Sequence, residues 1–309
     1  MDRIDAMRVF VAAVDEGSLA GAARRMRRSA AAVSRAIAFL EGHVGTALLH
    51  RTTRSLHLSE AGERYAAACR RVLAELDEAD MLAAGERSAP RGLLTVTAPV
   101  AAGENVLGPI LAGFMDAYPE VSVRLNMIDH PVSLIDEGMD LALRISHLAD
   151  SALVATRVGE VRRVVAASPS YLESHPAIEQ PSDLARHAIV AMTHFGLETW
   201  SFPPAPGSAV PRTVSFTPRL VVNTIRAAAT AAVEGRGVTR LFSYHIAAEL
   251  AAGSLKVILD RDEHEPVPVH LIAPPGRLSV PKVRAFVDYA VPRLRAHFAQ
   301  LCPPPLKSL

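Results

Sequence analysis

The fold of the N-terminal domain is decided between residues 18 and 40, which read SLAGAARRMRRSAAAVSRAIAFL. Ser18 and Ser29 each precede an apolar run at helical spacing, and a serine hydroxyl at that place can cap a helix by accepting a backbone N–H. Residues 4–14 carry another apolar stripe at helical spacing, which Gly17 ends. Two short helices joined by a tight turn, the first rich in alanine, predict a helix-turn-helix.

The second helix of this motif should expose the face opposite Val33, Ile37 and Leu40. Arg35 lies on that face, where a guanidinium can bond a guanine edge in two places or pair with a phosphate. The alternative is that Arg35 solvates an exposed helix face and that the arginines within 24–28 are a solvated charge run. We expect DNA contacts from Arg24, Arg28, Ser29, Ala31, Ser34, Arg35, Arg51, Thr52, Thr53 and Arg54.

A small hairpin and a long helix are predicted after the helix-turn-helix. Residues 46–58 partly alternate between apolar and polar side chains around a basic tip, which is typical of a wing. From Ser59 a helix should run to about Gly85. Its apolar positions step alternately by four and three, which predicts a coiled-coil seam for a dimer; the alternative is a helix lying on its own domain. The expected dimer residues are Tyr65, Cys69, Val72 and Leu76.

Strands and helices alternate beyond a hinge marked by Pro90 and Gly92. Strands followed by crossover helices predict mainly parallel sheets, and two such series in about 200 residues predict two α/β lobes. The expected fold class is therefore multidomain α and α/β. Strands are predicted over 93–98, 121–127, 141–145, 189–192, 219–222, 237–242 and 255–259, and helices over 105–118, 132–137, 224–234 and 243–252.

The domain boundaries are expected where these patterns change. A winged helix-turn-helix should occupy residues 1–58, followed by a dimerising linker helix over 59–88 and a hinge over 89–92. The effector-binding domain should span 93–301 and leave a tail at 302–309. Within it we expect lobe I over 93–162 and 267–301, and lobe II over 163–266.

Positive charge is concentrated in the N-terminal fifth of the chain. The whole sequence has 33 Lys and Arg against 32 Asp and Glu, but residues 1–58 hold nine Arg against five acids. This distribution favours an anionic partner for that segment alone. Cys69 and Cys302 are too far apart in sequence to suggest a zinc or disulfide framework, so we expect no metal and no cofactor. The charged N-terminus and the absence of a long apolar run predict a cytoplasmic protein without a membrane partner.

Ten short motifs occur in an order and spacing that resemble LysR-type transcriptional regulators. The match extends from Asp5 to about Leu294, and its motifs are weak singly but specific in series. The N-terminal motifs are AARRM at 22–26, AVSR at 32–35, FLE at 39–41, LLHRTTR at 48–54 and LSEAG at 58–62. The later motifs are VTAP at 96–99, YPEV at 118–121, DLALR at 140–144, ASPSYL at 167–172 and GRG at 235–237.

The resemblance implies a winged helix-turn-helix that binds an operator in double-stranded DNA, and a dimerising linker helix. It also implies a sensor domain with the fold of type 2 periplasmic binding proteins, and assembly into homodimers and then tetramers. The sequence departs from the family at Ala30 and Ala36, where glutamine is common. With fewer amides for base readout, methyl contacts, arginines and DNA shape should carry more of the discrimination.

A small-molecule effector is expected in a cleft where strand ends meet helix N-termini. In the resembling family a Ser or Thr often follows the residues matching Pro99 and Val100 and binds a carboxylate, but Ala101 and Ala102 stand here, with Glu104 nearby. We therefore expect a ligand larger and less acidic than a simple carboxylate. The expected contacts are Pro99, Val100, Ala101, Ile128, Asp129, His130, Thr193, His194, Phe195 and Asn223, although His130 and His194 could be ordinary loop residues.

Other function classes are less well supported. An enzyme would have to use the cluster at 262–265 with His270, but the prolines at 266 and 268 suggest a loop followed by an edge strand, and no nucleophile accompanies them. The basic N-terminal domain argues against a solute-binding protein of the transport type. A DNA-binding regulator with a ligand-free, vestigial sensor remains an alternative. We therefore expect a regulator that is not an enzyme.

Overall fold

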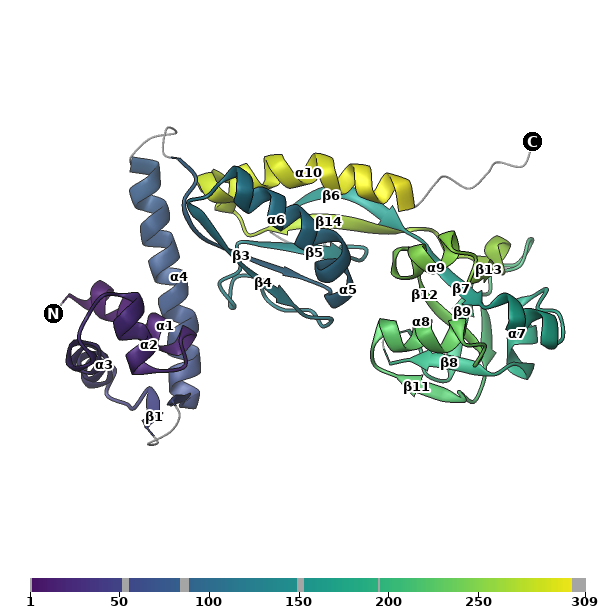
Figure 1. Ribbon diagram of the computed structural model, residues 1–309, viewed down its shortest axis with the longest axis horizontal. Coiled ribbons are helices and arrows are strands. Elements are labelled where there is room, and N and C mark those ends of the chain that lie inside the picture. Colours follow the sequence, from purple (N-terminus) through teal and green to yellow (C-terminus); the bar gives the residue numbers. More distant parts are fainter. Residues whose placement is uncertain (1, 52–55, 84–88, 149–152, 194, 302–309) are drawn as a thin grey trace.

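The computed structural model describes residues 2–51, 56–83, 89–148, 153–193 and 195–301. A small helical domain lies at one end of the molecule, a long helix stands beside it, and two α/β lobes follow (Figure 1). No helix in these described ranges is both long and apolar enough to cross a membrane.

The N-terminal domain consists of three helices and a two-stranded hairpin. The predicted caps are confirmed, since the Ser18 hydroxyl accepts from the Gly21 N–H at 3.0 Å and the Ser29 hydroxyl from the Ala32 N–H at 3.2 Å. Phe10, Ile37 and Leu40 are fully buried in its core. The elements are α1 (Arg3–Asp15), α2 (Leu19–Arg25), α3 (Ala30–Val44), β1 (Leu49–Arg51) and β2 (Leu56–Leu58).

The long helix α4 (Glu60–Ala83) packs on this domain more closely than predicted. Cys69 is 1% exposed in the domain core, and the Tyr65 ring lies 5.9 Å from that of Phe10. The premise that this seam has no partner within its own domain is therefore wrong for Tyr65 and Cys69. Val72, by contrast, is 45% exposed.

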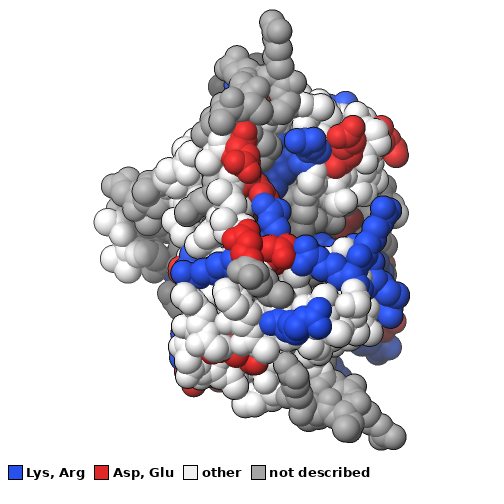
Figure 2. Space-filling model, turned by 90° about the vertical axis from the view of Figure 1, so that its left-hand side faces the viewer, with Lys and Arg blue, Asp and Glu red and all other residues white. Residues whose placement is uncertain are grey.

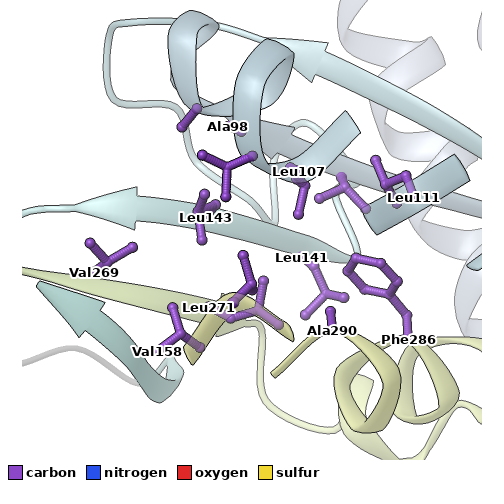
Figure 3. Close-up of a cluster of buried hydrophobic side chains, with 14 of the residues drawn as sticks. Ala98, Leu107, Leu111, Leu141, Leu143, Val158, Val269, Leu271, Phe286 and Ala290 are labelled. Atoms are coloured by element: carbon purple, nitrogen blue, oxygen red, sulfur yellow. The ribbon is translucent and has the colours of Figure 1, made fainter. Parts of the chain in front are cut away.

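Lobe I is a five-stranded sheet with helices that bury its inner face. Leu107 and Leu111 from one helical segment and Phe286 from another meet sheet residues in the core (Figure 3). The sheet order is β4 (Val121–Met127), β3 (Gly92–Ala98), β5 (Leu141–Ile145), β14 (Val267–Ala273) and β6 (Val154–Val161). The helices are α5 (Val100–Ala102), the π-helical turn η1 (Gly103–Leu107), α6 (Gly108–Ala117) and α10 (Pro281–Leu301), with the short turn η5 (Arg277–Ser279) before α10.

Lobe II repeats the plan with a second five-stranded sheet and a separate hairpin. The sheet order is β11 (Leu220–Val222), β8 (Ile189–Met192), β12 (Val238–Phe242), β7 (Arg163–Ala167) and β13 (Lys256–Ile258). The hairpin is β9 (Thr199–Phe202) with β10 (Arg212–Ser215). The helical segments are α7 (Pro169–Ser174), η2 (Pro181–Arg186), α8 (Ile225–Val233), η3 (Ser243–Ile246), α9 (Ala247–Ala251) and η4 (Asp260–Asp262).

Three expectations about these lobes are wrong. The sheets are mixed rather than mainly parallel, because β7 and β14, which follow the two crossings between lobes, run antiparallel to their neighbours. The strand β14 lies between β5 and β6 instead of at an edge. The helix predicted over 132–137 is a single turn, ended by Gly138 with φ +64°.

Candidate DNA-binding surface and effector cleft

Helix α3 presents the face that the sequence predicts. Arg35, Ala31 and Ala38 are exposed and Ser34 is partly exposed, while Val33, Ile37 and Leu40 are buried. Within the described residues no ion pair involves Arg35, so its guanidinium can reach a base edge or phosphate. The contact with DNA itself stays a prediction.

Ala36 does not belong to that face. Its side chain is fully buried in the core of the N-terminal domain, because it lies on the same side of α3 as Val33 and Leu40. The interpretation that Ala36 leaves a gap in base readout is therefore wrong. The argument about missing amides applies to Ala30, which is exposed.

The arginines before α3 divide into paired and unpaired groups. Arg28 donates two hydrogen bonds of 2.7 Å to Asp5 and so ties the turn to α1; this pairing lowers the pKa of the Asp5 carboxyl. Arg25 lies 3.4 Å from Glu16. Among the described residues Arg24 has no such pair, so its side chain is better placed than that of Arg28 to meet a phosphate.

Acidic side chains interrupt the basic surface at this end of the molecule. Figure 2 shows Lys and Arg gathered along one side of this face, with Asp and Glu between them near its centre. The wing adds β1, whose Arg51 pairs with Leu56 across the hairpin. Thr52, Thr53 and Arg54 lie outside the described residues, so their predicted contacts stay predictions.

A cavity of about 640 Å³ lies between the two lobes. Lobe I contributes residues from α5, η1 and β4's end, and lobe II contributes the start of α8 together with η3 and α9. Four of the predicted contacts line it, namely Val100, Ala101, Asp129 and Asn223. Sequence reasoning missed Asn105, Val106, Thr224, Ile225, Arg226, Ala229, Thr230, Tyr244, His245, Ala247, Ala248, Glu249 and His297.

Five other predicted contacts that lie within the described residues do not line this cavity. Phe195 instead packs inside lobe II, with its ring 5.1 Å from Phe242, and its carbonyl accepts a 2.8 Å hydrogen bond from Arg240. This packing does not support Phe195 as a ligand contact, and its assignment stays a prediction. His194 lies outside the described residues. Pro99, Ile128, His130 and Thr193 are near the cleft in sequence but are not part of the cavity wall.

Two ring-bearing residues missed by the sequence analysis, Tyr244 and His245, line the lobe II side of the cavity. Tyr244 is 6% exposed, and burial followed by the nearby charge of Asp129 raises its pKa. Burial lowers the pKa of His245 to about 3, and its Nδ1 accepts the Phe242 N–H at 3.3 Å. Both residues are therefore neutral near pH 7. They follow the end of β12, so a search for polar residues just after strand ends could have identified them.

The first helical turn of lobe I is already capped within the protein. The Asp129 carboxylate accepts the Val100 N–H at 2.9 Å. Because N–H groups at a helix start attract anions, Asp129 occupies the place that a ligand carboxylate would take.

The acidic cluster at 262–265, the candidate for the alternative enzyme function, forms structural contacts. Arg212 lies 2.5 Å from Asp262, Arg162 lies 2.6 Å from Glu263, and His264 contacts the carbonyl of Ser201 at 3.0 Å. These contacts join residues 262–264 to the β9–β10 hairpin and to Arg162, which precedes β7.

Comparisons with known proteins place the chain in one family. Residues 4–63 match the bacterial regulatory helix-turn-helix proteins of the LysR family, and residues 87–295 match the LysR substrate binding domain. An HTH-type transcriptional regulator of Xanthomonas campestris is 35% identical over 93% of this chain and 84% of its own length. The chain belongs to the LysR family of transcriptional regulators. An HTH-type transcriptional repressor of Pseudomonas aeruginosa is 30% identical over 94% of this chain and 92% of its own.

This LysR-type protein also resembles solved structures along nearly its whole length. CrgA of Neisseria meningitidis, a LysR-type regulator, has a TM-score of 0.60 and 28% identity, over 94% of this chain and 98% of its own. The full-length virulence activator AphB of Vibrio cholerae has a TM-score of 0.62 and 26% identity, over 94% of this chain and 99% of its own. The predicted fold class is confirmed, and the protein is a DNA-binding transcription regulator with an effector-binding domain, not an enzyme. Members of this family bind DNA and small molecules and form oligomers.

Proposed function

We propose that this LysR-type regulator recognises an operator in double-stranded DNA through α3, and that a small molecule in the inter-lobe cavity modulates this binding. The observation that carries the proposal is the exposed Arg35 on the capped helix α3, which forms no ion pair with any described residue. The cavity, with polar groups from both lobes, supports the effector part. The protein would act in the cytoplasm, where its DNA lies, and the domain boundaries predicted from the sequence belong to this proposal.

Arg35→Ala should weaken binding to the operator by roughly 1 to 3 kcal/mol, or about 5- to 150-fold, if Arg35 contacts a base edge. The reason is that a guanidinium can bond a base in two places, which alanine cannot replace. Gel-shift titration against an operator selected from random DNA and against its scrambled sequence measures the effect. The affinity for the operator should fall far more than the affinity for the scrambled DNA.

Arg24→Ala is the matched control, because this exposed arginine faces the phosphate backbone rather than the groove in our proposal. It should weaken both complexes about equally and reduce the salt dependence of binding. Equal binding of both DNAs by wild type and Arg35→Ala would show that the recognition face is misplaced.

We further propose that the protein is a homodimer through the outer side of α4, and that dimers pair into tetramers. Val72 lies on that side, with 45% of its surface exposed, and Leu76 is partly exposed. Tyr65 and Cys69 support the helix from within instead, since their side chains pack on the domain core.

Val72→Glu should break the dimer, because a charge buried in an apolar interface lacks a partner. Sedimentation should show half the assembly mass of the wild type. Val210→Glu is the control, since Val210 is 71% exposed in lobe II and distant in sequence from α4. An unchanged mass for Val72→Glu with intact DNA binding would contradict the interface.

A further inference from the structure

The side chains around the inter-lobe cavity are predominantly acidic. Among the described residues, Glu104 and Asp129 from lobe I and Glu249 from lobe II line it, against one guanidinium, that of Arg226. Burial lowers the pKa of both imidazoles in the wall, His245 and His297, so near pH 7 the charged groups of the described wall sum to −2. A partly enclosed cavity strengthens such a field relative to open water, which repels anions and attracts cations.

The helix start on the lobe I side of the cavity cannot offset this charge for an anionic ligand; the start of α8 lies on the opposite wall. The Asp129 carboxylate already holds the Val100 N–H at 2.9 Å. An entering carboxylate would have to displace Asp129 and would then meet Glu104 one turn further along. The local geometry therefore disfavours acids at this point of the cleft.

Tyr244 supplies a polar group to the cavity that is independent of the carboxylates. Its side chain is 6% exposed and lines the cavity, and within the described residues its hydroxyl forms no hydrogen bond with the protein. The hydroxyl oxygen is not among the fully buried unpartnered atoms, so it opens onto the cavity and is available to a ligand. An ammonium has three N–H donors and no acceptor, so it can donate hydrogen bonds to the Tyr244 oxygen and to a neighbouring carboxylate at the same time.

Small apolar side chains complete the wall. Ala101, Ile225, Ala229 and Ala248 face the same cavity, whose volume of about 640 Å³ lies in the usual range for small-molecule sites. These surfaces favour an apolar body attached to the charged group.

We propose that the inter-lobe cavity selects a small organic cation, a protonated amine on an apolar body, held by Asp129, Glu104 and the Tyr244 hydroxyl. The inference rests on the proposed function, because it names the chemistry of the effector. It narrows the expectation of a ligand larger and less acidic than a simple carboxylate to a ligand that carries a positive charge.

Phenethylamine and 3-phenylpropanoate test the inference, because they share an apolar body and carry opposite charges near pH 7. Calorimetric titration of the full-length protein should show binding of the amine and at least about tenfold weaker binding of the acid. Glu104→Gln should weaken the amine about tenfold or more, whereas Asp116→Asn, an exposed acid on α6 outside the cavity, should leave it unchanged.

Asp129→Asn gives the sharpest result. It removes a carboxylate and the strong cap of Val100, so the amine should bind more weakly and the acid more tightly than in wild type. Thermal melting of each variant establishes that it is folded.

Three outcomes would overturn the inference: tighter binding of the acid to wild type, no binding of either probe, or amine binding that neither Glu104→Gln nor Asp129→Asn changes. Operator gel shifts with and without phenethylamine separate this inference from the proposed function. Binding of the amine in the cavity without any change in operator affinity would leave the cation site standing and contradict the effector role.

Discussion

Asp15→Asn should destabilise the protein by about 3 kcal/mol, because it leaves three guanidinium groups around a buried position without their shared anion. The Asp15 side chain is 8% exposed and lies 2.9 Å from Arg70, 3.1 Å from Arg124 and 3.6 Å from Arg25. The arginines themselves are 31% to 45% exposed, so water partly compensates them and we expect the lower end of the range for a broken buried pair.

The position of Asp15 is the reason why we expect one carboxylate to have so large an effect. It ends α1, while its partners come from α2, from α4 and from β4 of lobe I. The cluster borders a cavity of about 410 Å³ between the N-terminal domain and lobe I. Asp15 therefore connects the DNA-binding domain, the long helix and the sensor.

Urea unfolding at neutral pH measures the decrease in the free energy of unfolding, and Asp77→Asn is the matched control. Asp77 pairs with Arg8 at 2.6 Å at the edge of the same cavity, but both side chains are more than 40% exposed. Removing an exposed pair should cost less than about 1 kcal/mol. Similar losses for the two variants would contradict the special role of Asp15.

The same carboxylate should contribute to acid sensitivity. Burial raises the pKa of Asp15, but hydrogen bonds from Arg70 and Arg124 outweigh burial and hold it below its ordinary 3.8. Because the pKa of Asp15 is lower in the folded protein than in the unfolded chain, its ion pairs stabilise the fold fully above pH 3.8. This stabilisation is lost as the pH falls through the lowered pKa. The stability difference between wild type and Asp15→Asn should therefore shrink below about pH 4.

The helix-turn-helix could be predicted because its signals are local. Ser18 and Ser29 cap their helices as expected, since capping depends on residues within one turn. The partner of α4 could not be predicted in the same way. The spacing of Tyr65 and Cys69 suits a second helix and the helix's own domain equally, and the structure buries both in that domain.

The inter-lobe cavity also combines residues that local patterns predict with residues that they do not predict. The expectation that a ligand binds where strand ends meet helix starts correctly predicted that Val100, Asp129 and Asn223 line the cavity, because such ends are visible in the sequence. It did not exclude Phe195, whose ring turns into lobe II, and it did not reach His297, which comes from α10. Which strand ends share one cavity depends on how the chain crosses between lobes, and no local pattern encodes that.

Gly62→Ala should destabilise the N-terminal domain by about 3 kcal/mol and reduce specific DNA binding with it. A Cβ on Gly62 would lie 1.9 Å from the carbonyl oxygen of Leu48 and 3.1 Å from the Leu58 side chain. That carbonyl is fixed, since it accepts the Ser59 N–H at 3.0 Å. Because the obstacle is backbone, α4 and the wing must separate to make room.

Gly42→Ala is the matched control, because Gly42 lies in α3 and a Cβ there meets nothing within 4 Å. Alanine restricts the unfolded chain more than glycine does, so this variant should be more stable than wild type by roughly 0.5 to 1 kcal/mol. Urea unfolding of both variants, followed by operator gel shifts, measures the two opposite effects. If Gly62→Ala proved as stable as Gly42→Ala, the close contact of α4 with the Leu48 backbone would be wrong, and with it the position of the wing beside the recognition helix.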